Sequence, residues 1–246
     1  MAERTFYSKE FTPQVNPPDD LLHFFLLLSR VIRYQVEYYP HHIFAGQSVD
    51  IHTRRMVTFW WWLDLPDGCN RKEGERMLWV HDIPEIRIDD LLAVEAALNP
   101  HLAKRKEEEE SEAASKLLSE PDYQLLRRFN RAADFWKGKE YDRSDLTAIA
   151  VKLIDIIDGN VIYHEIMSDY CRENGVSDLD KRMDASLHYT FNQARKLRKQ
   201  LGNLPGNTRG WFRSLINFQS EYIHQFWDEV PGINIPLALQ EEFLIT

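Results

Sequence analysis

The sequence feature that most constrains the fold is a long stretch of helical periodicity in the second half of the chain. It follows Arg143 and reads SDLTAIAVKLIDIIDGNVIYHEIMSDYCRE. Apolar residues recur there at helical spacing, which places them on one face of a helix: Leu146, Ile149, Leu153, Ile156 and Ile157. Ser144 is a good N-cap residue, and Gly175 ends the region. A helix of this kind needs other helices to cover its apolar face.

Shorter segments on both sides carry helical signals as well. We expect helices over residues 21–36, 47–64, 71–82, 88–98, 121–136, 178–201 and 208–230. No segment shows the strong alternation that is typical of strands. The pattern predicts an all-α fold, a compact single-domain helical bundle. We expect an N-terminal arm over 1–18, a core over 19–175, and a C-terminal helical extension over 176–246 that packs on the core.

Charge and composition restrict the partners. A net charge of −9 disfavours extended nucleic acid, whose binding needs a basic surface. The apolar stretches LLHFFLLLSRVI and MVTFWWWLDL are shorter than the ~20 residues that span a bilayer, so we expect no membrane partner. Cys69 and Cys171 form no disulfide framework, and the N-terminus does not resemble a signal peptide, which predicts a cytoplasmic protein.

One segment, residues 101–118, carries the charge run KRKEEEESEAASK. Opposite charges one turn apart favour a solvated helix face. A mobile lid is the alternative.

Three polar sites interrupt apolar helical segments: His52, the pair His81-Asp82, and Asp155. A carboxylate on an apolar face costs several kcal/mol unless it is paired or ligates something. Two histidines and two aspartates from three helices could form a divalent-metal site. The same residues can be explained without a metal. His52 could be a core histidine whose hydrogen bonds are satisfied, and Asp155 could form an ion pair with Lys152 or a nearby Arg.

The order of these motifs resembles the HD-domain metal-dependent phosphohydrolases, and within them the YfbR-like 5'-deoxynucleotidase branch. The resemblance covers roughly residues 21–169. Arg33-Tyr34 stands where the branch has an Arg followed by an aromatic residue, and QSVDIH places His52 as the first His. The HDxxE motif and the Asp five residues beyond it correspond to His81, Asp82, Glu85 and Asp90, and VKLID supplies Lys152 and Asp155.

The sequence departs from the branch at several places. Ile51 stands where the branch has an acidic residue before the first His, and Asp89 stands where it usually has Gly. The charged segment between residues 99 and 144 matches poorly, and the chain extends beyond the usual end. These departures concern the identity of the substrate more than the fold.

The resemblance implies a role for each matched residue. His52, His81, Asp82 and Asp155 would bind one divalent metal ion, which could be Mn, Co, Mg, Ni, Fe or Zn. Glu85 would orient the attacking water or exchange protons with it, and Asp90 would assist catalysis and bind the sugar. Arg33 and Lys152 would bind substrate with Asp90. The implied function is release of phosphate from a (deoxy)nucleoside 5'-monophosphate, in a protein that could be a homodimer.

Other functions fit the same superfamily. A nucleoside triphosphohydrolase, another nucleotide phosphoesterase and a non-catalytic nucleotide-binding regulator stay open. A guanosine-tetraphosphate hydrolase would normally have HDxxED, whereas Ile86 follows Glu85 here. Among neighbouring residues, we expect Arg55 to form a surface ion pair, Asp158 to be solvated or structural, and His164-Glu165 to be a metal-like pair without companions. Arg33 could instead pair with Glu37.

Overall fold

The computed structural model describes residues 15–33, 47–88, 99–177 and 181–233. Within these ranges the regular elements are helices, and a single β-bridge joins Ile32 to Ser48. The elements are η1 (Asp19–Leu21), α1 (Leu22–Leu28), α2 (Val49–Trp62), α3 (Arg71–Val80), η3 (Ile83–Ile86), α5 (Pro100–Leu117), α6 (Glu120–Trp136), α7 (Leu146–Glu173), α8 (Lys181–Gln200), η4 (Leu201–Asn203) and α9 (Arg209–Asp228). The predicted all-α fold is confirmed.

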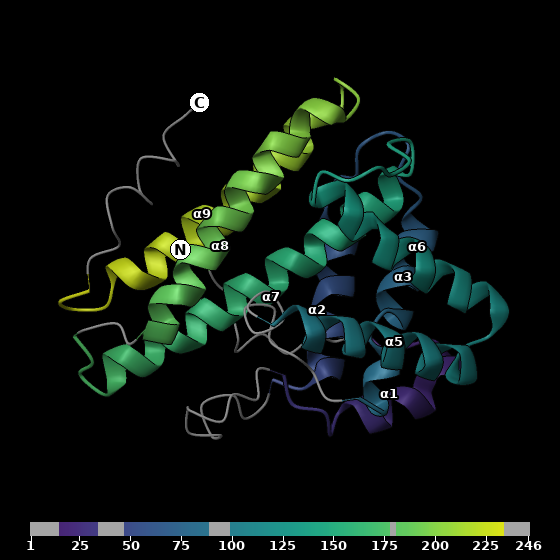
Figure 1. The fold of residues 1–246 in the computed structure, drawn as a ribbon, viewed down its shortest axis with the longest axis horizontal. Helices are drawn as coiled ribbons and strands as arrows, with labels where there is room; N and C mark the ends of the chain where they lie inside the picture. Colours follow the sequence, from purple (N-terminus) through teal and green to yellow (C-terminus); the bar gives the residue numbers. More distant parts are fainter. Residues whose placement is uncertain (1–14, 34–46, 89–98, 178–180, 234–246) are drawn as a thin grey trace.

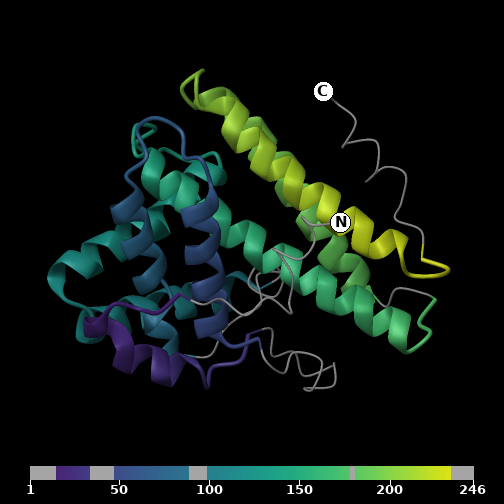
Figure 2. The same cartoon turned by 180° about the vertical axis from the view of Figure 1, so that it is seen from behind.

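Helix α7 is the axis of the molecule (Figure 1). Helices α2, α3 and α6 pack around one end of it, and α8 and α9 lie alongside the remainder, as the view from behind also shows (Figure 2). The helix is 28 residues long and buries apolar side chains on most of its circumference. A helix that is apolar nearly all round is stable only when neighbours surround it. The same burial makes any polar side chain on α7 costly unless it has a partner.

The first helix is shorter than predicted. The sequence indicated a helix over 21–36, but α1 ends at Leu28. The chain then turns and forms the bridge between Ile32 and Ser48, with the Arg33 amide donating to the Gln47 carbonyl. Arg33 therefore lies beyond a helix and beside the start of α2. Apolar periodicity could not locate this end, because the bridge depends on a segment distant in sequence.

The helix that precedes the His-Asp pair also ends early. The sequence predicted a helix to residue 82, whereas α3 ends at Val80 and His81 is its C-cap. The chain continues into the 3-10 turn η3, with Pro84 in its first positions and Glu85 buried. The tighter turn carries Glu85, so its position does not come from α-helical spacing after His81.

The start of α7 is set by a different residue from the one predicted. Ser144 was expected to be the N-cap, but the N-cap is Asp145, whose side chain accepts a hydrogen bond from the Ala148 amide. The Ser144 hydroxyl instead donates to Asp142. Asp145 also receives hydrogen bonds from Arg128 of α6, a tertiary contact that the local sequence does not contain.

The two predicted C-terminal helices are confirmed as α8 and α9, which pack on each other and, through α9, extensively on α7. The division into arm, core and extension stays a prediction. The predicted helix over 88–98 lies outside the described residues except for its first residue, and most of the tail beyond 230 lies outside them too. None of the helices described is both long and apolar enough to cross a membrane.

Candidate metal centre

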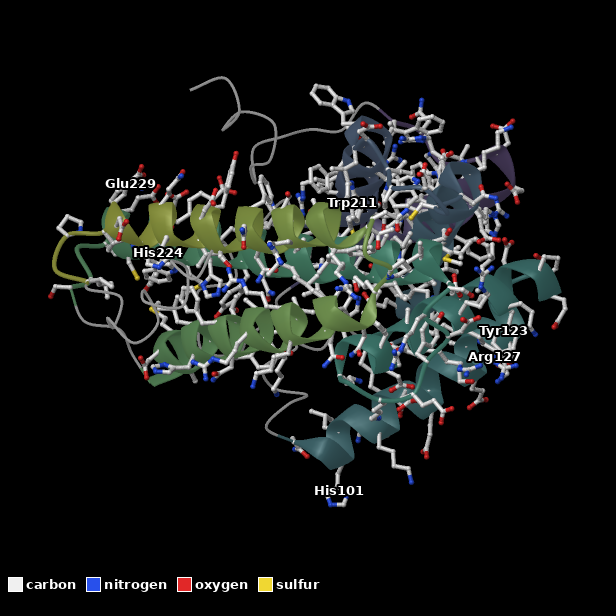
Figure 3. The ribbon with its side chains drawn as sticks, turned by 90° about the horizontal axis from the view of Figure 1, so that it is seen from above. His101, Tyr123, Arg127, Trp211, His224 and Glu229 are labelled. Carbon is white, nitrogen blue, oxygen red and sulfur yellow. The ribbon has the colours of Figure 1, made fainter. Side chains whose placement is uncertain are left out.

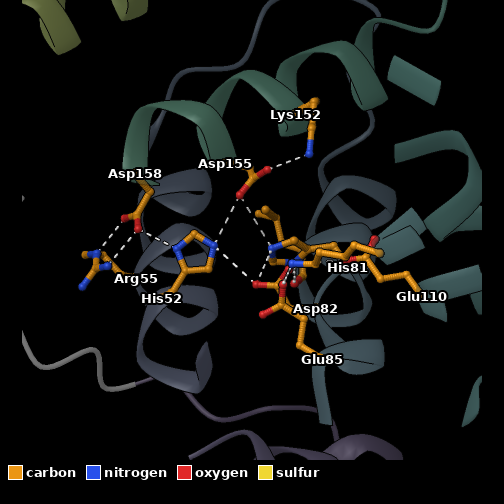
Figure 4. Close-up of polar contacts among 11 residues, drawn as sticks. His52, Arg55, His81, Asp82, Glu85, Glu110, Lys152, Asp155 and Asp158 are labelled. Atoms are coloured by element: carbon orange, nitrogen blue, oxygen red, sulfur yellow. Dashed lines mark hydrogen bonds and ion pairs between the residues drawn. The ribbon is translucent and has the colours of Figure 1, made fainter. Parts of the chain in front are cut away.

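Two histidines and an aspartate from three helices meet in the core (Figure 4). His52 comes from α2, His81 from the end of α3, and Asp155 from α7. One ligand atom of each lies within 4.8 Å of the others, and both imidazole side chains are 1% exposed. One divalent ion with bonds of about 2.0–2.2 Å could reach all three atoms after small adjustments.

Asp82 places a second carboxylate beside the imidazoles. Its Oδ2 lies 3.0 Å from His81 Nε2 and 3.5 Å from His52 Nε2. Asp155 Oδ1 lies 3.4 Å from His52 Nε2 and 3.9 Å from His81 Nε2. Both Nε2 atoms are buried, and within the described part of the chain neither has a partner in hydrogen-bonding geometry. Two buried nitrogens facing two carboxylates fit a cation, because a ligand bond would satisfy atoms that otherwise cost about 1–3 kcal/mol each.

The electrostatics of the cluster favour positive charge at its centre. Burial opposes ionisation of Asp82, but the neighbouring cations, His81 foremost, lower the pKa of that carboxyl below its usual value. Burial likewise opposes ionisation of Asp155, and Lys152 with the two imidazoles lowers its pKa well below the usual value. Burial opposes the charging of His81, yet the two carboxylates raise its pKa overall. The carboxylates therefore stabilise a proton on the imidazole, or a metal ion in its place.

Behind His52 lies a buried ion pair. His52 Nδ1 is 2.6 Å from Asp158 Oδ2, and Asp158 has no exposed surface. Arg55 donates to the same carboxylate through Nε at 2.6 Å and Nη2 at 2.8 Å. A carboxylate on the far nitrogen of a ligating His fixes its tautomer. The proton then lies on Nδ1, and the lone pair of Nε2 is directed at Asp82 and Asp155.

The prediction of a surface ion pair for Arg55 is wrong, because its side chain is 1% exposed and its partner is buried. Asp158, expected to be solvated or structural, is fully buried against a candidate ligand. A signal for both was present in the sequence. Arg55 follows His52 by three residues and Asp158 follows Asp155 by three, so each pair shares a helix face.

Lys152 forms an ion pair with Asp155, and this pair is compatible with a metal site at the same aspartate. Its Nζ lies 2.8 Å from Asp155 Oδ2, so the predicted ion pair exists. The same ammonium lies 4.1 Å from the centre of the Phe129 ring, which makes an edge-type contact with the His81 ring. The ion pair does not exclude a metal site, because the other oxygen of Asp155 faces the imidazoles.

The charged helix α5 supplies one wall of the site. Lys106 Nζ lies 3.1 Å from Glu85 Oε1 and 3.2 Å from Glu110 Oε1. Burial raises the pKa of Glu110. The predicted solvated face is present in the exposed pairs Lys104–Glu108 and Arg105–Glu109. Lys106 and Glu110, from the same run, face the site instead, which the charge pattern did not indicate.

The other predicted substrate residues are less central. The positive charge of Arg33 contributes to lowering the pKa of Asp82, and its guanidinium lies against Gly159 of α7. Asp90 lies outside the described residues, as do Asp89 and Glu37. His101 is exposed and points away from the molecule (Figure 3).

His164 is no metal ligand in this arrangement. Its Nε2 lies 2.9 Å from Thr190 Oγ1, and its Nδ1 accepts from Trp227 Nε1 at 3.3 Å. Burial lowers its pKa to about 3, so it is neutral at physiological pH. It joins α7 to α8 and α9, as expected of a histidine without ligand companions.

A comparison of the sequence with protein-family models found a match. The model described as HD domain matches residues 41–200, which is more than half of the chain and includes all four predicted ligands. The chain belongs to the HD-domain family. HD domains are generally metal-dependent hydrolases, and the cluster of His52, His81 and Asp155 is compatible with a divalent ion. Comparisons with curated proteins and with solved structures found no match.

Proposed function

We propose that this HD-domain protein is a metal-dependent phosphomonoesterase that releases phosphate from a (deoxy)nucleoside 5'-monophosphate. The observation that carries the proposal is the pair of buried, inward-facing Nε2 atoms of His52 and His81, opposed by Asp82 and Asp155. HD-domain membership indicates the reaction class. The choice of a nucleoside monophosphate rests on the sequence resemblance, above all on Arg33-Tyr34 and VKLID.

The metal would be held by the two imidazoles and by Asp82 and Asp155. A divalent ion bound there supplies Lewis acidity, which lowers the pKa of water and polarises a phosphate oxygen. Asp158 and Arg55 keep the His52 ring in the ligating tautomer.

Cationic side chains would receive the phosphate. Arg33 offers a guanidinium whose planar donor pairs match phosphate oxygens. Lys152, whose ammonium lies beside the Asp155 carboxylate, offers a compact positive charge. Both neutralise part of the dianion and orient its phosphorus toward the cluster.

Glu85 would handle the proton. Its side chain is 10% exposed, in the turn that follows His81-Asp82. A carboxylate in that position can accept a proton from the attacking water and return it to the leaving alkoxide, which is general acid–base catalysis. Asp90 would bind the sugar hydroxyl.

The test is a screen of the purified protein for released phosphate, using nucleoside mono- and triphosphates with added Mn, Co or Mg, together with metal analysis. We expect phosphate from monophosphates, lost in His81→Ala and Asp82→Ala and retained in His101→Ala, whose side chain points away from the cluster. Triphosphate as product would favour a triphosphohydrolase. Binding of nucleotide without turnover, for every substrate and metal, would favour a regulator and refute the enzyme.

A further inference from the structure

Helix α5 contributes a lysine to the wall of the metal centre, in a segment whose sequence indicates only surface charge. Lys106 is 18% exposed, whereas Lys104 and Lys116 on the same helix are 75% and 54% exposed. The partners of those two lysines are glutamates on α5 itself, four residues away. Lys106 differs because it also reaches a carboxylate of another element.

That carboxylate belongs to Glu85. Lys106 Nζ lies 3.1 Å from Glu85 Oε1, which is hydrogen-bonding distance, and the glutamate side chain is 10% exposed. Glu110, one turn along α5, lies 3.2 Å from the same ammonium. The ammonium of Lys106 therefore contacts carboxylates of two different elements at once.

The contact is supported by the packing of the two elements. Helix α5 packs on η3 and on α6, so its inner face is fixed against the turn that carries Glu85. An ion pair that is mostly excluded from solvent is screened less by water and salt than a surface pair. Lys106 can therefore restrict the position of Glu85 in a way that the exposed pairs of α5 cannot restrict theirs.

We propose that Lys106 is a positioning residue for catalysis, which acts by holding the Glu85 carboxylate against the metal centre. This inference rests on the proposed role of Glu85. Lys106 has two carboxylates beside it, so its charge is largely compensated, and it serves Glu85 rather than the substrate phosphate. A glutamate that transfers protons must lie within hydrogen-bonding reach of the water it serves.

The kinetic test compares Lys106→Met, which keeps the aliphatic stem, with Lys106→Arg and with the control Lys116→Met. We expect Lys106→Met to lower kcat about 10- to 100-fold with little change in KM, because misplacing a catalytic group by about 1 Å costs on that order. Lys106→Arg should recover part of the loss, and Lys116→Met should behave as wild type. A rise in KM at unchanged kcat would make Lys106 a phosphate ligand and overturn the proposal.

A double-mutant cycle distinguishes action through Glu85 from an independent effect. In the Glu85→Gln background, Lys106→Met should change kcat less than about twofold, because residues that act as a unit are not additive. If the two losses multiply, Lys106 does not act through Glu85.

A readout independent of turnover is the position of Glu85 in crystal structures of the metal-free variants. We expect the Glu85 side chain to be displaced in Lys106→Met and in place in Lys106→Arg and Lys116→Met. An unmoved Glu85 in Lys106→Met would refute the proposal whatever the kinetics. If wild type hydrolyses no nucleotide while Glu85 moves as expected, the proposed function fails and the positioning contact stands.

Discussion

Replacing Asp158 by Asn tests the ion pair behind His52. The change is nearly isosteric but removes the negative charge of the carboxylate. That carboxylate accepts one hydrogen bond from His52 at 2.6 Å and two from Arg55 at 2.6 and 2.8 Å. An amide oxygen can keep some of these bonds, while its NH₂ group faces donors. The buried Arg55 guanidinium loses the carboxylate that accepts two of its hydrogen bonds. Removing one partner of a buried pair costs about 3–5 kcal/mol. We expect the free energy of unfolding to fall by that amount.

The same substitution should weaken metal binding. His52 loses the acceptor that keeps the proton on Nδ1, so Nε2 is no longer held ready for a metal. Mutations of such outer partners typically cost about 10- to 100-fold in metal affinity. Titration calorimetry with Mn²⁺ measures this loss directly, and chemical denaturation of the metal-free protein measures the stability.

Two further variants separate the effects. Asp169→Asn changes an aspartate on the same helix whose Arg172 partner is 41% exposed, and should cost no more than about 1 kcal/mol with unchanged metal affinity. The double variant Arg55→Met with Asp158→Leu should be more stable than Asp158→Asn, because the buried arginine charge is removed together with its carboxylate, yet bind metal as weakly. Wild-type affinity for Mn²⁺ in Asp158→Asn would refute the assigned role of the carboxylate.

Three further predictions concern stability. Gly74→Ala should cost about 1–3 kcal/mol, because an added Cβ would meet Trp60 at 2.2 Å, whereas Gly210→Ala meets nothing within 4 Å and should not destabilise; thermal denaturation compares them. Below pH 6.5 the unfolded chain protonates His164 but the folded chain does not until about pH 3. Stability should thus fall by several kcal/mol between these values, and His164→Gln should reduce the fall, measured by denaturation across pH. Asp145→Ala should cost at least about 1 kcal/mol and Ser144→Ala less, by urea unfolding.

Each of these has a result that would contradict it. Equal melting temperatures of the two glycine variants would mean that Trp60 yields without cost. An unchanged pH dependence after replacement of His164 would show that other groups dominate acid unfolding. A larger loss at position 144 than at 145 would restore the hydroxyl as the cap of α7.

Much of the site was readable from the sequence because helical patterns are local. His52, His81-Asp82 and Asp155 interrupt apolar segments, and the polar exception in such a segment is where chemistry or pairing is expected. The sequence could not distinguish a metal ligand from an ion-pair partner at Asp155. In the structure both kinds of contact are present, because Lys152 lies beside one carboxylate oxygen and the imidazoles face the other. Single-residue chemistry leaves that choice open, since it depends on where each oxygen points.

The sequence by itself determined the helical class and most helix positions, because periodicity and turn residues act within a few residues of one another. Tertiary structure decided three further points. It ended α1 early through the bridge to Ser48, it buried Arg55 against Asp158, and it turned Lys106 inward onto Glu85. In each case the two residues that make the contact are between 16 and 103 positions apart in the sequence. Local sequence decides whether a charged residue lies on a helix, whereas the packing of distant elements decides which residue it contacts.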